Sequence, residues 1–317
     1  ALFGQRFREI PLDEHFGVPV DQFLGNNGGV VLANPNAPTG REIPLSDIRE
    51  ILSCNPDVAV VIDEAYVDFG ASSALELLDR YPNLLVVRTM SKSRSLAGLR
   101  VGFAFGSENL IAALNCVKNS FNSYTLDRLA LAGAGGALRD DAYFRTTLLK
   151  IVHTRDKTAA RLKGLGFQVC DSSSNFLFLS HPDVPARMLL DGLRQRGILV
   201  RWWDKPRISN HLRVTVGTDG EMDALCAALE ELVRLGSPDW AVLFRLFGEK
   251  KAHPLAFLQS RAFMQMFTKI CAEEYPYTAF ADAFHTVRSM LLPVLYLLTG
   301  EVPKADLYHA ICTGYGG

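Results

Sequence analysis

The first hundred residues alternate short apolar runs with segments of helical periodicity. An amphipathic helix is expected over residues 45–54. Four runs rich in Val, Ile, Leu and Phe are expected to form strands over residues 29–33, 58–62, 84–88 and 100–105. Apolar runs without polar alternation are typical of strands that are buried on both faces. The pattern therefore predicts an α/β domain with a mostly parallel sheet, whose ligands bind at the carboxyl ends of the strands.

A second, smaller α/β domain is expected to follow a helical stretch. Helical spacing continues over residues 108–165 with a break at 139–141. Short strands are then expected over residues 167–170, 175–179, 198–201 and 212–216, and helices over 185–196 and 220–235. After residue 238 the composition shifts toward Phe, Tyr, Met and Leu in a mostly helical pattern. We therefore expect three units, over residues 1–145, 146–236 and 237–317.

Composition and charge exclude several classes of protein. With 48% hydrophobic and 21% charged residues, the chain has the balance of a globular protein. The 33 Lys and Arg residues offset 34 Asp and Glu residues to a net charge of −1, so bulk charge favours neither nucleic acid nor a membrane surface. The apolar run 290–298 contains Pro293 and is shorter than the roughly 20 residues that span a bilayer. Six scattered cysteines without a C-x-x-C pair indicate free, mostly buried thiols in a cytoplasmic protein and no zinc site.

The expected strand that ends at Asp63 delivers a carboxylate to the carboxyl edge of the sheet. Three interpretations of the run 60–66 compete. An apolar strand followed by Asp and Glu is typical of a P-loop ATPase, but the chain lacks the glycine-rich loop that holds the phosphates. Asp63 could instead cap the structure that follows it, because Asp is a common capping residue. The third interpretation depends on residues downstream.

A lysine follows the next expected strand in a segment of small residues. Lys92 lies between Ser91 and Arg100, in a stretch of Ser, Gly and Ala that permits close approach of a ligand. A lone lysine in a loop is usually a solvated charge, but a lysine beside other cations and out of water loses its proton more easily. That is the requirement for a Schiff base with an aldehyde. Ser91 and Arg100 offer a hydroxyl and a guanidinium group to a phosphate.

A turn rich in Pro, Asn and Gly over residues 34–40 completes the set of motifs. In order and spacing, this turn, the Asp-Glu-Ala-Tyr run and the Ser-Lys segment resemble the class I and II aminotransferases of fold type I, which use pyridoxal 5′-phosphate. The resemblance covers about residues 1–236 and is closest to the histidinol-phosphate members of the family. Segments 174–176, 197–201 and 212–218 support it in the expected smaller domain.

The resemblance implies roles for the residues at the carboxyl edge. Lys92 would form the Schiff base with pyridoxal 5′-phosphate and then carry a proton between the substrate and the cofactor. Asp63 would pair with the protonated pyridine nitrogen, which lets the ring accept electrons. Tyr66 would bond the ring oxygen, and Ser91 with Arg100 would hold the phosphate.

The resemblance also implies substrate contacts. Asn175, Arg201 and Arg213 would face the active site, where arginines of the family bind the substrate phosphate and the carboxylate of glutamate. A surface position beside two tryptophans remains the alternative for Arg201. The family has an Asn directly before Pro-Thr-Gly, where this chain has Ala37, so the ring contact falls to Asn36 as the nearest amide.

The activity implied is amino transfer between histidinol phosphate and 2-oxoglutarate by a cytoplasmic homodimer, without nucleic acid or membrane partners. An aromatic aminotransferase, a threonine-phosphate decarboxylase and an inactive composite fragment remain alternatives. The family carries further residues before the position that matches Ala1, including a phosphate-binding turn and strands of the large sheet. We therefore expect a sheet with open edges in this chain.

The last segment, residues 239–317, resembles part of a different family, the family 4 glycosyltransferases of Pel-type exopolysaccharide synthesis. The resembling runs are 284–293 and 303–317. The donor-binding half of that family has no counterpart in the chain, so glycosyl transfer is not expected. His309 fits either a buried structural histidine or a substrate contact. The composite hypothesis is an aminotransferase segment joined near residue 237 to a piece of an unrelated enzyme.

Overall fold

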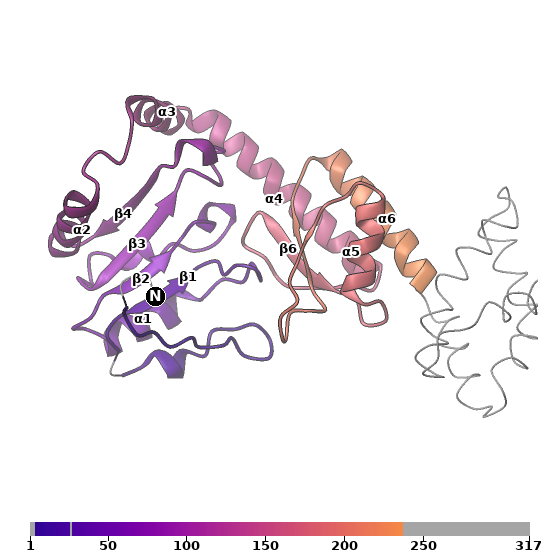
Figure 1. The fold of residues 1–317 in the computed structure, drawn as a ribbon, viewed down its shortest axis with the longest axis horizontal. Coiled ribbons are helices and arrows are strands. Elements are labelled where there is room, and N and C mark those ends of the chain that lie inside the picture. The colour runs from indigo at the N-terminus through magenta and orange to yellow at the C-terminus, as the bar shows by residue number, and fades with distance from the viewer. Residues whose placement is uncertain (1–3, 26, 237–317) are drawn as a thin grey trace, which may run out of the picture. The chain divides into compact units, whose positions relative to one another are not determined.

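Four strands form the first sheet, in the order in which they occur along the chain: β1 (Val30–Ala33), β2 (Val60–Asp63), β3 (Leu84–Thr89) and β4 (Gly102–Gly106). The first three strands are parallel, and β4 runs antiparallel to β3 (Figure 1). The structure is a computed structural model that describes residues 4–25 and 27–236. The expectation of a mostly parallel sheet in an α/β fold is confirmed.

One face of this sheet is covered and carries the first core. Helix α1 (Leu45–Cys54) packs on it together with two 3-10 helices, η1 (Val20–Phe23) and η3 (Ala74–Leu77). The strands bury alternate side chains toward these helices: Val30, Leu32, Val60, Ile62, Leu84 and Val86. The intervening residue Val31 points the other way and is 74% exposed, as the period of two in a strand requires.

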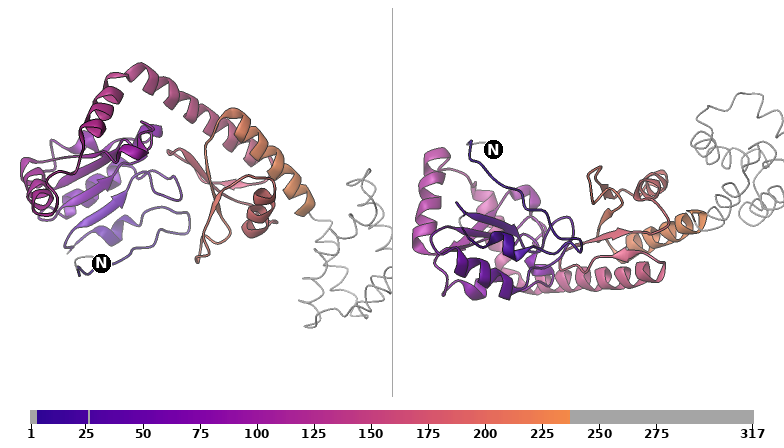
Figure 2. Two further views of the ribbon diagram at one scale, coloured as in Figure 1. Left: turned by 45° about the horizontal axis from the view of Figure 1, so that its top comes forward. Right: turned by 90° about the horizontal axis from the view of Figure 1, so that it is seen from below.

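Three helices follow the first sheet: α2 (Glu108–Phe121), α3 (Arg128–Arg139) and α4 (Asp141–Gly164). The break expected at 139–141 is a helix cap, because Asp140 ends α3 and its side chain accepts the N–H of Tyr143 in the first turn of α4 (3.2 Å). Helix α4 packs against the 3-10 helix η2 (Val67–Phe69) beside the first sheet and against elements of the second (Figure 2). The boundary expected between residues 145 and 146 lies within this helix.

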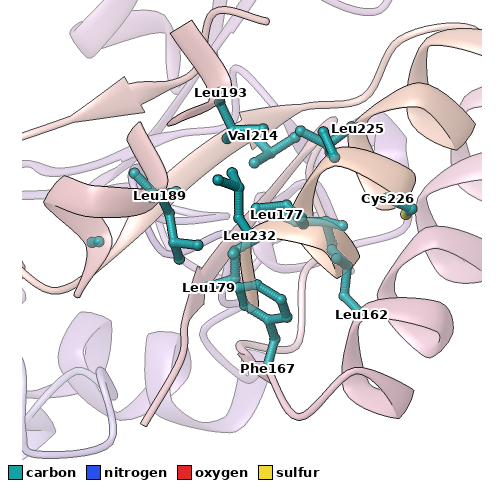
Figure 3. Close-up of a cluster of buried hydrophobic side chains, with 14 of the residues drawn as sticks. Leu162, Phe167, Leu177, Leu179, Leu189, Leu193, Val214, Leu225, Cys226 and Leu232 are labelled. Atoms are coloured by element: carbon teal, nitrogen blue, oxygen red, sulfur yellow. The ribbon is translucent and has the colours of Figure 1, made fainter. Parts of the chain in front are cut away.

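The second sheet is antiparallel, with the order β5-β6-β8-β7, and consists of β5 (Gln168–Val169), β6 (Phe176–Ser180), β7 (Arg201–Trp202) and β8 (Leu212–Thr215). Helices α5 (Ala186–Gln195) and α6 (Asp219–Gly236) complete this part. Leucines of the strands, of α4 and of both helices form its core (Figure 3). All five residues of β6 are buried, which explains why the sequence shows a continuous apolar run there.

Two expectations need correction. The strand expected over residues 198–201 begins only at Arg201, where pairing with β8 begins. Residues 198–200 are apolar because Ile198 and Val200 pack against the core, and not because they belong to a strand. The prediction that the cysteines are mostly buried is wrong for Cys54 and Cys116, which are both exposed. Cys54 is the last residue of α1, and Cys116 lies on α2, a helix with no buried residue.

The four described cysteines are free. None of the helices that the structure describes is long and apolar enough to cross a membrane. The third expected unit, over residues 237–317, lies outside the described residues.

Two leucines of the second part provide a test of its core. Leu189 on α5 is fully buried, and Leu199 is 80% exposed. We expect Leu189→Ala to lower the free energy of unfolding by about 2–5 kcal/mol, because it leaves a cavity that the surrounding side chains fill only in part. Leu199→Ala should change it by less than about 0.5 kcal/mol. Urea unfolding followed by circular dichroism measures both, and equal losses would contradict this core.

Candidate active site

The three parallel strands end side by side and bring the first group of predicted residues to one edge. Ala33 of β1 lies opposite Asp63 of β2, which lies opposite Val87 of β3. The N–H of Asn34 donates to the carbonyl of Asp63 (2.9 Å), and the N–H of Glu64 donates to the carbonyl of Val87 (2.8 Å). These bonds extend the ladder past the strand ends, so the segments that follow all three strands leave from the same edge.

The segment that carries Lys92 is closed at its base and packed on α3. The N–H of Met90 donates to the carbonyl of Val101 (3.1 Å), so the segment begins and ends between β3 and β4. Met90 and Val101 are buried against α3. At Gly133 of α3, a Cβ atom would lie 2.5 Å from the Leu99 side chain. The close approach that glycine permits therefore holds this segment at a fixed place on the helix.

A line of ring contacts runs from Lys92 to the second sheet. The Lys92 Nζ lies 5.3 Å from the centroid of the Tyr66 ring. The Tyr66 ring meets Phe176 of β6 edge to face, with centroids 5.1 Å apart. The guanidinium carbon of Arg213 on β8 lies 4.9 Å from the centroid of Phe176. The rings of Tyr66 and Phe176 therefore connect Lys92 to Arg213 through three consecutive contacts.

Arg201 joins the same group of cations. It lies opposite Arg213 in the pairing of β7 with β8. Both guanidinium carbons lie 5.4 Å from the Trp203 ring centroid. The Nε atom of Arg213 is buried and has no hydrogen-bond partner among the described residues. A buried donor without a partner is costly, and an anion that accepted its hydrogen bond would remove this cost.

The remaining predicted residues make local bonds. One oxygen of the exposed Asp63 accepts the N–H of Ala65 (3.0 Å) in a local turn. Asp63 does not cap the 3-10 helix that follows, because the N-cap of η2 is Tyr66. The Asn36 side-chain oxygen accepts the Thr39 hydroxyl (2.9 Å), so it is engaged inside its own turn. The Asn175 carbonyl accepts the N–H of Val216 (2.9 Å). This bond places Asn175 at the beginning of β6, beside the ring of Phe176.

Ser91 and Arg100 lie at the two ends of the Lys92 segment. The Ser91 oxygen accepts the Thr89 hydroxyl (2.9 Å), which leaves its own proton available to a ligand. Arg100 has left-handed backbone (φ 55°), and its guanidinium donates to the carbonyl of Ala97 (3.1 Å). Lys92 itself is exposed. The expectation that Lys92 lies out of water is therefore wrong for the described residues, because its segment stands at the edge of the sheet.

Sequence reasoning missed a buried arginine behind the site. Arg155 of α4 donates from Nη1 to the carbonyl of Phe69 (2.8 Å) and to that of Ser174 (3.0 Å). Phe69 ends the 3-10 helix that follows Tyr66, whereas Ser174 directly precedes Asn175. Arg155 thus links the two segments that carry predicted site residues. One arginine within a helical pattern gives no signal of this in the sequence.

A second link joins the turn over residues 34–40 to the segment 172–174, which directly precedes Asn175 and β6. The N–H of Ser173 donates to the carbonyl of Gly40 (2.9 Å). Gly40 has a φ of +78°, and a Cβ atom there would lie 2.5 Å from the Ser172 hydroxyl. Glu42 accepts the N–H of Ser72 (2.7 Å) and the hydroxyl of Ser173 (3.3 Å). Only glycine combines this backbone conformation with this close contact.

Comparison with known proteins gives a consistent result for this part of the chain. The family model described as aminotransferase class I and II matches residues 4–229. Histidinol-phosphate aminotransferase 2 of Burkholderia lata is 53% identical over 232 residues, which are 73% of this chain and 65% of that relative. Histidinol-phosphate aminotransferase of Aromatoleum aromaticum is 52% identical over 238 residues, 74% of this chain and 67% of the relative. The chain therefore spans about two thirds of the length of these relatives.

A solved structure agrees with these relatives. Histidinol-phosphate aminotransferase of Sinorhizobium meliloti in complex with pyridoxal-5′-phosphate superposes with a TM-score of 0.60 at 29% identity, over 66% of this chain and 58% of that one.

A second family model, described only as a domain of unknown function (DUF3492), matches residues 202–317. It overlaps the first match over residues 202–229. In this overlap Val214, Leu225 and Leu229 pack in the core of the second sheet, together with β6 and α5. The resemblance of residues 239–317 to a glycosyltransferase stays a prediction, since those residues lie outside the described part.

The Arg155 link can be tested by a matched pair of substitutions on α4. Arg155→Met leaves two buried carbonyl groups without their donor, so we expect a loss of about 1–3 kcal/mol in the free energy of unfolding. Amide hydrogen exchange over residues 66–72 and 172–176 should also become faster. Arg145 lies on the same helix in an exposed ion pair with Asp141, and Arg145→Met should cost less than about 0.5 kcal/mol. Unchanged exchange in both segments would contradict the link.

Proposed function

The chain belongs to the class I and II aminotransferases, and on this premise we propose that it transfers amino groups with pyridoxal 5′-phosphate bound at Lys92. The observation that carries the proposal is the line of contacts from Lys92 through Tyr66 and Phe176 to Arg213. It connects an amine that can hold an aldehyde, through two aromatic rings, to a cation that can hold an anionic substrate.

The groups at the carboxyl edge fit this cofactor in chemical type. The edge offers an exposed amine on Lys92, an exposed carboxylate on Asp63 and a phenol on Tyr66. Ser91 and Arg100 add a hydroxyl and a guanidinium group at the ends of one segment. When bound, pyridoxal 5′-phosphate supplies a ring that accepts the electron pair released at the substrate carbon.

The chain's own residues would each perform one task. Once the amino group of the substrate has displaced it from the aldehyde, the Lys92 amine would take a proton from the substrate carbon and return it to the cofactor carbon that carried the aldehyde, which a long, exposed side chain can reach. Asp63 holds a proton on the pyridine nitrogen by its negative charge. Ser91 and Arg100 orient the phosphate by hydrogen bonds. Tyr66 packs between the lysine and Phe176, and its hydroxyl would bond the ring oxygen of the cofactor.

We propose histidinol phosphate and 2-oxoglutarate as the substrates, with imidazole acetol phosphate and glutamate as products. Both substrates carry anionic groups, a phosphate on the amino donor histidinol phosphate and carboxylates on the amino acceptor 2-oxoglutarate. Arg213, whose Nε has no partner among the described residues, and Arg201 beside it suit such groups, because a guanidinium binds planar and tetrahedral anions by paired hydrogen bonds. The names of the relatives from Burkholderia lata and Aromatoleum aromaticum support the same choice. A homodimer and a cytoplasmic location complete the proposal.

The test of the cofactor is covalent trapping. The purified chain is incubated with pyridoxal 5′-phosphate, reduced with borohydride and digested, and the added mass is located by peptide mass spectrometry. We expect one adduct per chain, on Lys92, because this amine stands among groups that hold the phosphate and the ring. Lys92→Ala is the control and should take no adduct at that peptide. Adducts scattered over surface lysines would contradict the proposal.

The test of the substrate uses Arg213. We expect Arg213→Lys to raise the KM for histidinol phosphate by about 10- to 100-fold, because lysine cannot form the paired hydrogen bonds of a guanidinium. The KM for an amine without phosphate, such as histidinol, should change by less than about 3-fold. Steady-state assays with both amines measure this difference. Preference of the unmodified chain for an aromatic amino acid, or carbon dioxide release from threonine phosphate, would instead assign one of the related activities.

A further inference from the structure

A buried ion pair lies directly behind the candidate site and has no role in the steps above. The Glu64 side chain is fully buried, and its Oε2 atom lies 2.8 Å from Nη2 and 3.0 Å from Nε of Arg88. Arg88 also donates to the Ser73 hydroxyl (2.7 Å), and Glu64 accepts the N–H of Ala74 (2.6 Å). Because both partners make several bonds, the pair holds β3 and the segment that follows β2 in one relative position.

A second carboxylate, that of Asp68, connects this ion pair to Ser93, the residue after Lys92. The Asp68 Oδ1 atom lies 3.8 Å from Nη1 of Arg88, and its other oxygen accepts the hydroxyl of Ser93. Ser93 is buried, at 7% exposure, although the adjacent Lys92 is exposed. A hydrogen bond to a carboxylate is stronger than one between neutral groups. The side chain next to the reactive amine is therefore held by a charged acceptor.

The Asp68–Ser93 bond joins the two segments whose separation matters for the chemistry. Asp68 lies in η2, two residues after Tyr66, and Ser93 directly follows Lys92. The amine itself has a long, flexible side chain, and its 5.3 Å approach to the Tyr66 ring is a weak contact for an exposed cation. The backbone anchor therefore sets where the amine can reach. Misplacement of a reacting group by about 1 Å can cost about 100-fold in rate.

We propose that Asp68 and Ser93 are positioning residues, which hold the Lys92 segment against the segment of Tyr66 so that the amine meets its reaction partner in one geometry. The inference rests on the proposed function in that Lys92 is the amine that reacts. Arg88 and Glu64 fix Asp68 in turn, because Arg88 pairs with both carboxylates.

The experiment compares the rate at which Lys92 takes up pyridoxal 5′-phosphate in five proteins: the unmodified chain, Asp68→Ala, Ser93→Ala, the double variant and Asp79→Ala. The adduct is trapped with borohydride at increasing times and measured on the Lys92 peptide. We expect each single substitution to slow the reaction about 5- to 20-fold, and the double variant to be no slower than the slower single one, because both remove the same bond. Asp79 is an exposed aspartate outside the network, and its replacement should leave the rate unchanged.

Asp68→Asn provides the conservative control. Its amide oxygen still accepts the Ser93 hydroxyl, but it lacks the charge that pairs with Arg88. We expect it to recover most of the rate lost in Asp68→Ala. Equal rates in both variants would mean that the charge paired with Arg88, and not the hydrogen bond to Ser93, holds the segment, and this would overturn the role given to Ser93.

Amide hydrogen exchange without cofactor gives a second readout. We expect exchange over residues 89–96 to become about 10-fold faster in Asp68→Ala and in Ser93→Ala, with exchange in α1 unchanged. Unchanged exchange over 89–96, additive losses in the double variant, or faster exchange throughout the chain would each overturn the proposal. If the unmodified chain takes no adduct on Lys92, the proposed function fails, and the exchange measurement alone then decides whether Asp68 and Ser93 hold this segment.

Discussion

The guanidinium of Arg155 bonds two carbonyl groups from segments 105 positions apart in the chain, one at Phe69 and one at Ser174. The first follows Tyr66, and the second precedes the strand that carries Phe176. The two segments also meet through the edge contact of the Tyr66 and Phe176 rings, which is worth about 1 kcal/mol beyond the area it buries, and through Glu42, which bonds both Ser72 and Ser173. Burial of a cation is costly unless its donors are bonded, and here the two carbonyls accept from Nη1 and Asp156 accepts from Nε. The arginine thus commits both segments to one relative position.

Other links meet at the same point, residues 172–176. Gly40 accepts a hydrogen bond from Ser173, and Glu42 bonds Ser72 and Ser173 together. The entrance of β6 is therefore fixed to the turn that follows β1 and to the segment that follows β2. Several independent bonds on one short segment restrict its motion more than any single bond could. A site built from loops gains in this way the precision that strands and helices usually provide.

The sequence predicted most of the strands and helices, for definite reasons. Continuous apolar runs identified β1, β2, β3 and β6. Only β6 is buried along its whole length, whereas β1 and β2 have fully buried side chains on one face only, so burial on both faces was wrong for these two strands. Asp63 and Lys92 stood out because each follows such a run. The positions of Arg155 and Asp68 could not be predicted. Their partners are 86 and 25 positions away, and a single charged residue with a distant partner leaves no periodic signal.

Local pattern also failed where pairing decides the outcome. Residues 198–200 are as apolar as a strand, yet only Arg201 and Trp202 pair with β8. The small residues next to Lys92 in the sequence could not predict that this side chain is exposed either. Those neighbours describe how closely a ligand can approach, whereas exposure depends on which other segments cover the edge of the sheet.

The placement of two guanidinium groups around Trp203 explains how the proposed site would favour anions. Arg201 and Arg213 lie opposite each other on neighbouring strands, where like charges repel. Each also contacts the face of the same indole ring, whose negative π-system reduces the repulsion without removing it. An anion between them would replace this repulsion by attraction and would accept the hydrogen bond of the buried Arg213 Nε. A neutral ligand would do neither, so the free-energy difference between anionic and neutral ligands arises from the unliganded state as much as from the contacts of the complex.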